Sequence, residues 1–315
     1  MTLTELKYIV AVARERHFGK AAEACFVSQP TLSVAVKKLE EELDLKLFER
    51  NANEVTVTPL GAEIVRQAQS VLDQASNIKE IAKRGKDPLA GALRLGVIYT
   101  IAPYLLPDLV RQIITHSPQM PLMLQENFTV KLLEMLRTGE IDCAILADPF
   151  PDAGLAVAPL YDEPFFAALP SKHPLASQAS VSAEQLKNET MLLLGNGHCF
   201  RDHVLEVCPE FARFSSNTEG IRKSFEGSSL ETMKHMVAAG MGITLVPRLS
   251  VPAQAPGSQE STFVTYLPVQ DAAGMPPPTR RVVLAWRRSF TRYEAIAALR
   301  NAIYGCALPG VTRLS

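Results

Sequence analysis

The chain has no long apolar run. No stretch of about 18 or more residues is apolar throughout, which is the length at which a run predicts a membrane-spanning helix. The first ten residues already carry Glu5 and Lys7, and charges at these positions do not fit a secretory signal peptide. We therefore expect no membrane partner and a cytoplasmic location.

Cysteine and recognisable zinc-ligand spacings are also scarce. The 315 residues include five cysteines and six histidines, and no CxxC or HxxxH pair occurs among them. An odd number of cysteines in a reducing compartment argues against a framework of structural disulfides. The sequence thus predicts at most one functional cysteine pair, no metal and no cofactor.

Neither sign of charge is in excess. The net charge is −1, and residues 1–58 hold eight basic side chains against nine acidic ones. Composition alone therefore does not predict nucleic-acid binding, which would depend on where the charges lie. What remains is the composition of a globular protein, with 47% hydrophobic and 21% charged residues and a length typical of two or three domains.

One stretch, residues 197–208 (GHCFRDHVLEVC), is typical of a redox switch. A thiol reacts as its thiolate, so a reactive cysteine needs positive charge or helix N-terminal amides to lower its pKa from about 8.5. His198 and Arg201 flank Cys199, and Asp202 is a candidate N-cap for an amphipathic helix that leads to Cys208. We therefore predict a lowered pKa for the Cys199 thiol.

Helix geometry predicts what oxidation of this pair would require. If the nine residues from Cys199 to Cys208 are helical, they advance about 13 Å and turn about 900°, which places the two sulfurs on opposite faces. A disulfide needs Cα atoms within about 7 Å of each other. The pair can bond only if the helix unravels, so oxidation would be a conformational change.

Two other interpretations of the cysteines stay open. The remaining three lie in apolar surroundings and are expected to be inert core residues: Cys25, Cys143 and Cys306. Four possible zinc ligands lie within the same stretch: His198, Cys199, His203 and Cys208. Adjacent ligands such as the first two rarely share one ion comfortably, so the redox interpretation is favoured over zinc.

The first 58 residues predict a winged helix-turn-helix domain. Apolar spacing indicates helices over residues 4–16, 20–25 and 28–43, the last beginning with a capping serine and a first-turn proline. Two short runs at 47–50 and 54–58 predict a hairpin wing. The third helix would enter the major groove of double-stranded DNA. The candidates for contact with bases or phosphates are Ser28, Gln29, Pro30, Thr31, Ser33, Lys37 and, in the wing, Arg50.

This region resembles the DNA-binding domain of LysR-type transcriptional regulators. The motifs that carry the resemblance are FGKAAEA (18–24), VSQPTLS (27–33), KLEEEL (38–43), LFER (47–50) and TPLG (58–61). The family's plan extends over the whole chain. The resemblance implies a homodimer, commonly assembled into a homotetramer through its effector domains, that binds promoter DNA, acts with RNA polymerase and is not an enzyme.

A long helix is expected to follow the winged domain, within a dimerisation and hinge segment at residues 59–87. Seven apolar residues at spacings of three and four form a heptad-like seam: Leu60, Ile64, Ala68, Val71, Ala75, Ile78 and Ala82. This seam could pack on the chain's own effector domain. Its polar flanks favour dimerisation instead, as the resemblance also implies.

Residues 88–315 alternate expected strands and helices, which predicts an α/β domain with a mostly parallel sheet. By the resemblance this is a two-lobed, periplasmic-binding-protein-like regulatory domain. Its first lobe would comprise residues 88–163 and 268–315, and its second lobe residues 164–267. Ligands of such folds bind between the lobes, at the carboxyl ends of strands.

The regulatory half resembles the peroxide-sensing members of the LysR family. The resemblance rests on GHC (197–199) and Cys208, with PYLLP (103–107), SLET (229–232) and MVAAG (236–240). It implies that hydrogen peroxide oxidises Cys199 to a sulfenic acid, which Cys208 resolves to a disulfide. The residues implied in binding peroxide or activating the thiolate are Thr100, Thr129, His198, Arg201, Asp202 and Arg281. Of these, Arg281, preceded by Arg280, could equally be a surface strand residue.

The predicted function is therefore a peroxide-sensing activator or repressor of antioxidant genes. Oxidation would refold the regulatory domain and re-orient the DNA-binding domains. A thiol peroxidase would use the same cysteine pair, yet it would not need residues 1–85. A LysR-type regulator that responds to a small organic acid or to zinc would keep the DNA-binding end and use the cleft for another ligand.

Overall fold

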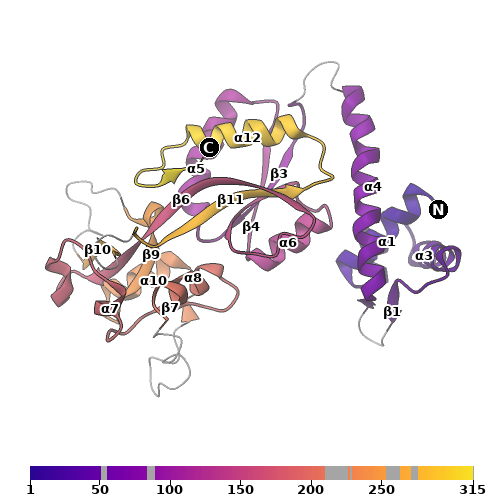
Figure 1. Ribbon diagram of the computed structural model, residues 1–315. Coiled ribbons are helices and arrows are strands. Elements are labelled where there is room, and N and C mark those ends of the chain that lie inside the picture. The colour runs from indigo at the N-terminus through magenta and orange to yellow at the C-terminus, as the bar shows by residue number, and fades with distance from the viewer. Residues whose placement is uncertain are drawn as a thin grey trace.

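The protein was analysed as a computed structural model, which describes residues 1–50, 55–83, 89–209, 226–227, 229–252, 263–270 and 276–314. The expected turn of the wing, the hinge and most of segment 209–227 lie outside these residues. Figure 1 shows a helical N-terminal domain, one long helix beside it and a larger mixed α/β domain. No helix in the described ranges is long and apolar enough to cross a membrane.

The N-terminal domain is the expected winged helix-turn-helix. Its elements are α1 (Leu3–Glu15), α2 (Phe18–Ala24), α3 (Gln29–Leu43), β1 (Phe48–Arg50) and β2 (Val55–Val57). Ser28 caps α3 by accepting a hydrogen bond from the Thr31 amide, and Pro30 stands in the first turn, as the sequence predicts. At the other end of α3, the buried Glu40 carboxylate accepts the amides of Leu47 and Phe48, which ties the wing to this helix.

The long helix α4 (Pro59–Lys83) divides its apolar seam between two surroundings. Ala68 is buried in the core of the N-terminal domain, where α4 packs on α1. Leu60, Val71 and Ile78 are exposed, the last with 69% of its surface open. No described residue of the same chain covers these three side chains, so a partner helix remains the prediction for them.

The regulatory domain is built on one eight-stranded sheet. Its strands are β3 (Leu93–Ile98), β4 (Leu122–Asn127), β5 (Cys143–Asp148), β6 (Leu155–Pro170), β9 (Thr244–Pro247), β10 (Val264–Pro268), β11 (Thr279–Arg287) and β12 (Thr312–Arg313). The central order is β10-β6-β11-β5-β3-β4, and β9 and β12 pair with β6. The sixteen-residue β6 is long enough to belong to both lobes.

The expectation of a mostly parallel sheet is wrong. Only β3 pairs in parallel, with β4 and β5, and the other pairings within this sheet are antiparallel. The reason is that β11 returns from the second lobe against the direction of β6 and inserts between β5 and β6. Helices α5 (Ala102–His116) and α6 (Thr129–Arg137) supply the crossovers that the parallel part requires.

Each lobe has its own core. The first core draws on the sheet between Leu93 and Tyr161, on β11 and on α12 (Tyr293–Gly305). The second draws on β6 from Phe165 onward, on α8 (Cys199–Val207) and on α10 (Leu230–Ala238). Figure 1 shows β6 and β11 running from one lobe into the other, so the regulatory domain is two-lobed as expected.

Smaller elements complete the second lobe. They are η1 (Pro174–Ser177), α7 (Ala183–Leu186), β7 (Leu193–Leu194), β8 (Glu226–Gly227) and η3 (Arg248–Ser250). The short parallel pair of β7 and β8 lies near the start of α8. This arrangement places the first turn of α8 at the boundary of the two lobes, against the ends of β3 and β4.

Candidate functional site

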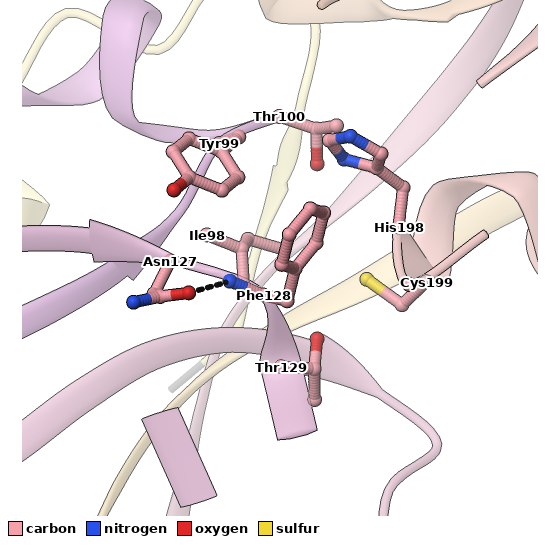
Figure 2. A pocket seen from close by; sticks show the side chains of 9 residues that line it. Ile98, Tyr99, Thr100, Asn127, Phe128, Thr129, His198 and Cys199 are labelled. Carbon is pink, nitrogen blue, oxygen red and sulfur yellow. Dashed lines mark hydrogen bonds between the residues drawn. The ribbon is translucent and has the colours of Figure 1, made fainter. Parts of the chain in front are cut away.

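The residues around Cys199 form a small pocket between the lobes. Three segments line it: the end of β3, the turn from β4 into α6, and the start of α8 (Figure 2). The lining residues are Ile98, Tyr99, Thr100, Asn127, Phe128, Thr129, Gly197, His198 and Cys199. Four residues predicted from the sequence, Thr100, Thr129, His198 and Cys199, are therefore brought together. The cavity measures about 10 Å³, which is room for about one water-sized molecule.

Cys199 is the first residue of α8, with His198 as its N-cap. The expectation that Asp202 caps this helix is wrong. Gly197 has a φ of +97° and turns the chain just before the helix, so that the helical conformation begins three residues before Asp202. Asp202 instead lies in the first turn, where a carboxylate is stabilised by the helix dipole.

The pKa of the Cys199 thiol is raised, against the expectation of a lowered one. Burial of the side chain is the largest cause, and it outweighs the lowering effects of the Thr129 hydroxyl and of the Arg280 cation. The Asp202 carboxylate raises the pKa further. Arg201, which was expected to activate this thiol, donates instead to the Leu194 carbonyl at 3.0 Å.

The cation that acts on Cys199 is Arg280, which is buried between the lobes. Its Nε donates to Glu163 at 2.9 Å, its Nη1 to the Thr100 hydroxyl at 2.9 Å and its Nη2 to the Thr100 carbonyl at 3.0 Å. The guanidinium also lies 5.2 Å from the ring centre of Phe200. Arg280 thus holds Thr100 at the pocket wall while its own charge is balanced by Glu163.

Arg281 does not face the pocket, so the placement inferred for it is wrong. Its guanidinium forms a surface ion pair with Asp162, with Nε to Oδ1 at 2.9 Å, and half of its side chain is exposed. Side chains alternate across a strand, so only one of two neighbouring arginines on β11 can point between the lobes. Both faces of β11 carry apolar residues, so the sequence does not indicate which of the two arginines points between the lobes.

Thr129 presents an unpaired hydroxyl to the pocket. The oxygen is buried and makes no hydrogen bond of ordinary geometry with any described residue, although it is near enough to lower the pKa of the Cys199 thiol. Figure 2 shows this hydroxyl and the sulfur facing each other below the Phe128 ring. A buried hydroxyl without a partner costs free energy, and a small polar ligand would satisfy it.

Cys208 lies at the other end of α8. It is the C-cap of the helix and is buried in the core of the second lobe, whereas Cys199 packs against the core of the first. All five cysteines are described, and none of them forms a disulfide. The segment between the pair is helical as predicted, so the two sulfurs are separated by a whole helix and point into different cores.

The four possible zinc ligands of this stretch do not come together. His203 Nε2 bonds to the Asp148 carbonyl at 2.9 Å, and burial lowers the pKa of its imidazole. Cys208 lies in the second core, away from His198 and Cys199. In the part of the chain that the structure describes, no three His, Cys, Asp or Glu side chains are grouped as metal ligands.

The candidate DNA contacts share an open face at the start of α3. The set of Ser28, Gln29, Pro30, Thr31 and Lys37 is exposed, and Ser33 is half-buried. Lys37 lies 3.6 Å from Glu41, and Ser28 also bonds the Thr31 hydroxyl at 2.8 Å. The side chain of Arg50 lies outside the described part of the wing.

Sequence reasoning overlooked Phe26, which precedes this face. Its ring is 93% exposed, and its φ of +59° is a conformation that bulky residues rarely adopt. It follows Cys25, the C-cap of α2, at a position where its amide hydrogen bond to the Glu23 carbonyl closes the helix and glycine is the usual residue. It is thus both strained and exposed, next to the residues predicted to contact DNA.

These features define a transcriptional regulator with a DNA-binding winged helix-turn-helix and a two-lobed sensor domain. Residues 3–62 match the model of the bacterial regulatory helix-turn-helix protein, lysR family, and residues 86–305 match the LysR substrate binding domain. The chain belongs to the LysR family of transcriptional regulators.

Within this family the chain is similar to OxyR proteins. It is 39% identical over 300 residues to the hydrogen peroxide-inducible genes activator of Pectobacterium carotovorum, covering 94% of this chain and 95% of that one. Full-length OxyR C199D from Pseudomonas aeruginosa is 48% identical, with a TM-score of 0.78 and coverage of 98% and 99%. An H2O2-bound mutant of Corynebacterium glutamicum OxyR is 33% identical, with a TM-score of 0.61 and coverage of 96% and 91%.

Proposed function

We propose that this protein is a hydrogen peroxide-sensing transcriptional regulator in which Cys199 is the residue that peroxide oxidises. The observation that carries the proposal is the small pocket, where the sulfur faces the buried, unpaired Thr129 hydroxyl. The names of the similar proteins, which include hydrogen peroxide-inducible genes activators, support it. The fixed cation of Arg280 stabilises the thiolate that must attack.

The first step forms a bond between the Cys199 sulfur and one peroxide oxygen. The O–O bond breaks, and the other oxygen leaves as hydroxide, which takes a proton and becomes water. The sulfur is oxidised by two electrons to a sulfenic acid, and the peroxide is reduced. Hydrogen bonds from Thr129 and Thr100 to the peroxide oxygens would hold the O–O bond in line with the sulfur.

The second step joins the two cysteines. The Cys208 thiolate attacks the Cys199 sulfur, an S–S bond forms, the S–O bond breaks, and the sulfenic oxygen leaves as hydroxide, which takes a proton and becomes water. A disulfide needs Cα atoms within about 7 Å, whereas nine helical residues span about 13 Å. Helix α8 must therefore unravel, which removes Cys199 from the first core or Cys208 from the second.

The rival ligands have less support. The small size of the pocket favours a ligand of one or two heavy atoms over an organic acid, which would need a wider opening. Zinc would need ligands that the described residues do not group. Peroxide, in contrast, has only two heavy atoms. A regulator would consume peroxide stoichiometrically, whereas an enzyme would turn it over.

The same proposal assigns the rest of the chain. The start of α3 would contact promoter DNA in the major groove, and α4 would pair with α4 of a second chain. A homotetramer would form through the regulatory domains, and RNA polymerase would be the partner at the promoter. Refolding of α8 would change how the regulatory domain holds the DNA-binding domains.

Two cysteine variants test the proposed chemistry. Cys199→Ser should consume no hydrogen peroxide beyond the background set by the other thiols, and it should leave DNA binding fixed in the reduced form. Cys208→Ser should still react, and its sulfenic acid should be trapped by dimedone at Cys199, as detected by mass spectrometry. An unaltered peroxide response in the Cys199→Ser protein would refute the proposal.

A further inference from the structure

Three aromatic rings line the Cys199 pocket. The ring centres of Phe128 and His198 are 4.8 Å apart, those of Tyr99 and Phe128 are 5.2 Å apart, and those of Tyr99 and His198 are 5.9 Å apart. All three separations lie in the range of attractive edge-to-face contact. Phe128 is therefore in contact with both other rings and occupies the centre of the cluster.

Each ring is the direct chain neighbour of a pocket residue. Tyr99 precedes Thr100, Phe128 precedes Thr129, and His198 precedes Cys199. The rings thus come from the same three segments as the polar groups, two from the first lobe and one from the second (Figure 2). The backbone therefore ties the ring cluster to the same three segments as the groups that would hold peroxide.

The backbone of Gly197 leaves little room beside Phe128. A Cβ atom built at Gly197 would lie 3.3 Å from the Phe128 ring, so ring and backbone are already in close contact. Tyr99 and Phe128 are each 37% exposed, whereas His198 is only 7% exposed. The two half-exposed rings consequently form the outer rim, and the cavity of about 10 Å³ lies inside it.

We propose that Tyr99 and Phe128 form an aromatic rim that restricts oxidation of Cys199 to hydrogen peroxide and excludes hydroperoxides that carry a bulky organic group. The inference rests on the proposed peroxide chemistry and names which class of oxidant the site accepts. The residue that sets the limit is Phe128, because its ring makes the two shortest ring contacts of the cluster and lies beside the Gly197 backbone.

The geometry of the reaction explains why the rim matters. The sulfur attacks the terminal oxygen of R–O–O–H along the O–O axis, an S–O bond forms, the O–O bond breaks, and R–O⁻ leaves and takes a proton to become R–OH. The R group therefore points away from the sulfur as the bond breaks. A hydrogen atom fits this position, whereas a tert-butyl or cumyl group would overlap the rings.

Oxidation rates with three oxidants test the inference in the full-length protein. The wild-type protein, Phe128→Ala and Tyr99→Ala would be mixed with hydrogen peroxide, tert-butyl hydroperoxide or cumene hydroperoxide, and the oxidised fraction of Cys199 followed by rapid quenching and mass spectrometry. Phe128→Ala should raise the rate constants for both organic hydroperoxides at least about tenfold, the scale on which a pocket discriminates by size. Selectivity is measured as the ratio of each organic rate constant to that for hydrogen peroxide, and this ratio should rise above its wild-type value when the ring is lost.

A matched control is Tyr293→Ala, which removes an exposed aromatic ring at the start of α12, outside the pocket lining. It should change none of the three rate constants. If Phe128→Ala fails to fold, Phe128→Leu and Tyr99→Ala replace it. If Cys199 of the wild-type protein reacts with cumene hydroperoxide as fast as with hydrogen peroxide, the proposed aromatic rim is contradicted and the proposed function is not. A wild-type Cys199 that does not react with hydrogen peroxide would overturn the proposed function itself.

Discussion

Arg280 and Arg281 are neighbouring residues on β11, and the face of the strand that each occupies decides what its side chain contacts. Arg280 is buried on Glu163 and Thr100, and its cation lowers the pKa of the Cys199 thiol. Arg281 faces solvent with Asp162. The pair offers a matched comparison, because the same side chain stands at adjacent positions in two environments.

Replacing Arg280 with Met should slow oxidation of Cys199 by peroxide. Loss of the cation raises the thiol pKa, and each unit of rise lowers the thiolate fraction below that pKa by about tenfold. The rate therefore rises with pH in both proteins, but the variant needs a higher pH to reach the same rate. Stopped-flow rates between pH 6 and pH 10 would measure the shift.

Arg281→Met is the control for this measurement. An exposed ion pair contributes little free energy. The pH profile of the Arg281→Met protein should therefore overlay that of the wild-type protein. Arg280→Met also leaves the buried Glu163 carboxylate without its charged partner, which can destabilise the protein. If the single variant is unstable, the double variant Arg280→Met with Glu163→Gln replaces it, because it removes both charges. A normal pH profile in a folded Arg280 variant would show that another group stabilises the thiolate.

The sequence predicted some residues of the pocket and missed others for a physical reason. The resemblance to peroxide-sensing regulators marked Cys199, Thr100 and Thr129, and the structure brings all three together. Tyr99 and Phe128 gave no signal, because their contact depends on how three loops meet rather than on any local pattern. The same limit applies to Arg280, whose burial depends on Glu163, 117 residues away in the chain.

At the scale of the element, α4 carries the clearest untested surface. Its buried residues pack on α1, and its exposed apolar residues Leu60, Val71 and Ile78 are left uncovered by the part of the chain that the structure describes. Val71 and Ile78 are one heptad apart, which is the spacing that pairs two helices. The helix therefore has one face that packs on its own domain and a second, open apolar face, which we predict pairs with a second chain.

Charged substitutions on this second face should break the dimer. Val71→Glu with Ile78→Glu should weaken self-association at least about tenfold, because each carboxylate would be buried against its counterpart. Sedimentation velocity over a dilution series would measure this. Ser76→Glu is the control, since it adds the same charge to an exposed site about 200° around the helix from Ile78. Equal association of all three proteins would place the dimer interface elsewhere.

Elements were predictable where the local chemistry is strong. The cap of α3 by Ser28 follows from side-chain hydrogen bonding within four residues. The start of α8 was misjudged, because Gly197 and not a capping side chain sets it. The direction of β11 depends on a return from the second lobe, which no local pattern encodes.

At the scale of the whole molecule, β11 links the sensor to the DNA-binding end. Arg280 near the start of this strand holds the pocket, and Arg287 at its end donates to Asp73 of α4 at 2.8 Å. Arg287 also donates to the carbonyls of Leu136 and Ile141, and Ser289 donates to Asp73 at 2.9 Å. The regulatory domain is therefore in direct contact with the helix that leads to the DNA-binding domain.

A bridge between Cys199 and Cys208 is the event from which every larger change would follow. Reduced, the two thiols lie in separate cores at the two ends of α8. Oxidised, they must come within bonding distance, which requires α8 to unravel.

The most direct test treats the full-length protein with one equivalent of hydrogen peroxide, digests it without reductant and searches for the peptide that links Cys199 to Cys208. We predict that this peptide forms, that a dithiol removes it, and that far-ultraviolet circular dichroism loses helical signal as it forms. A protein that remains fully reduced, or that links other cysteines while α8 stays intact, would contradict the account.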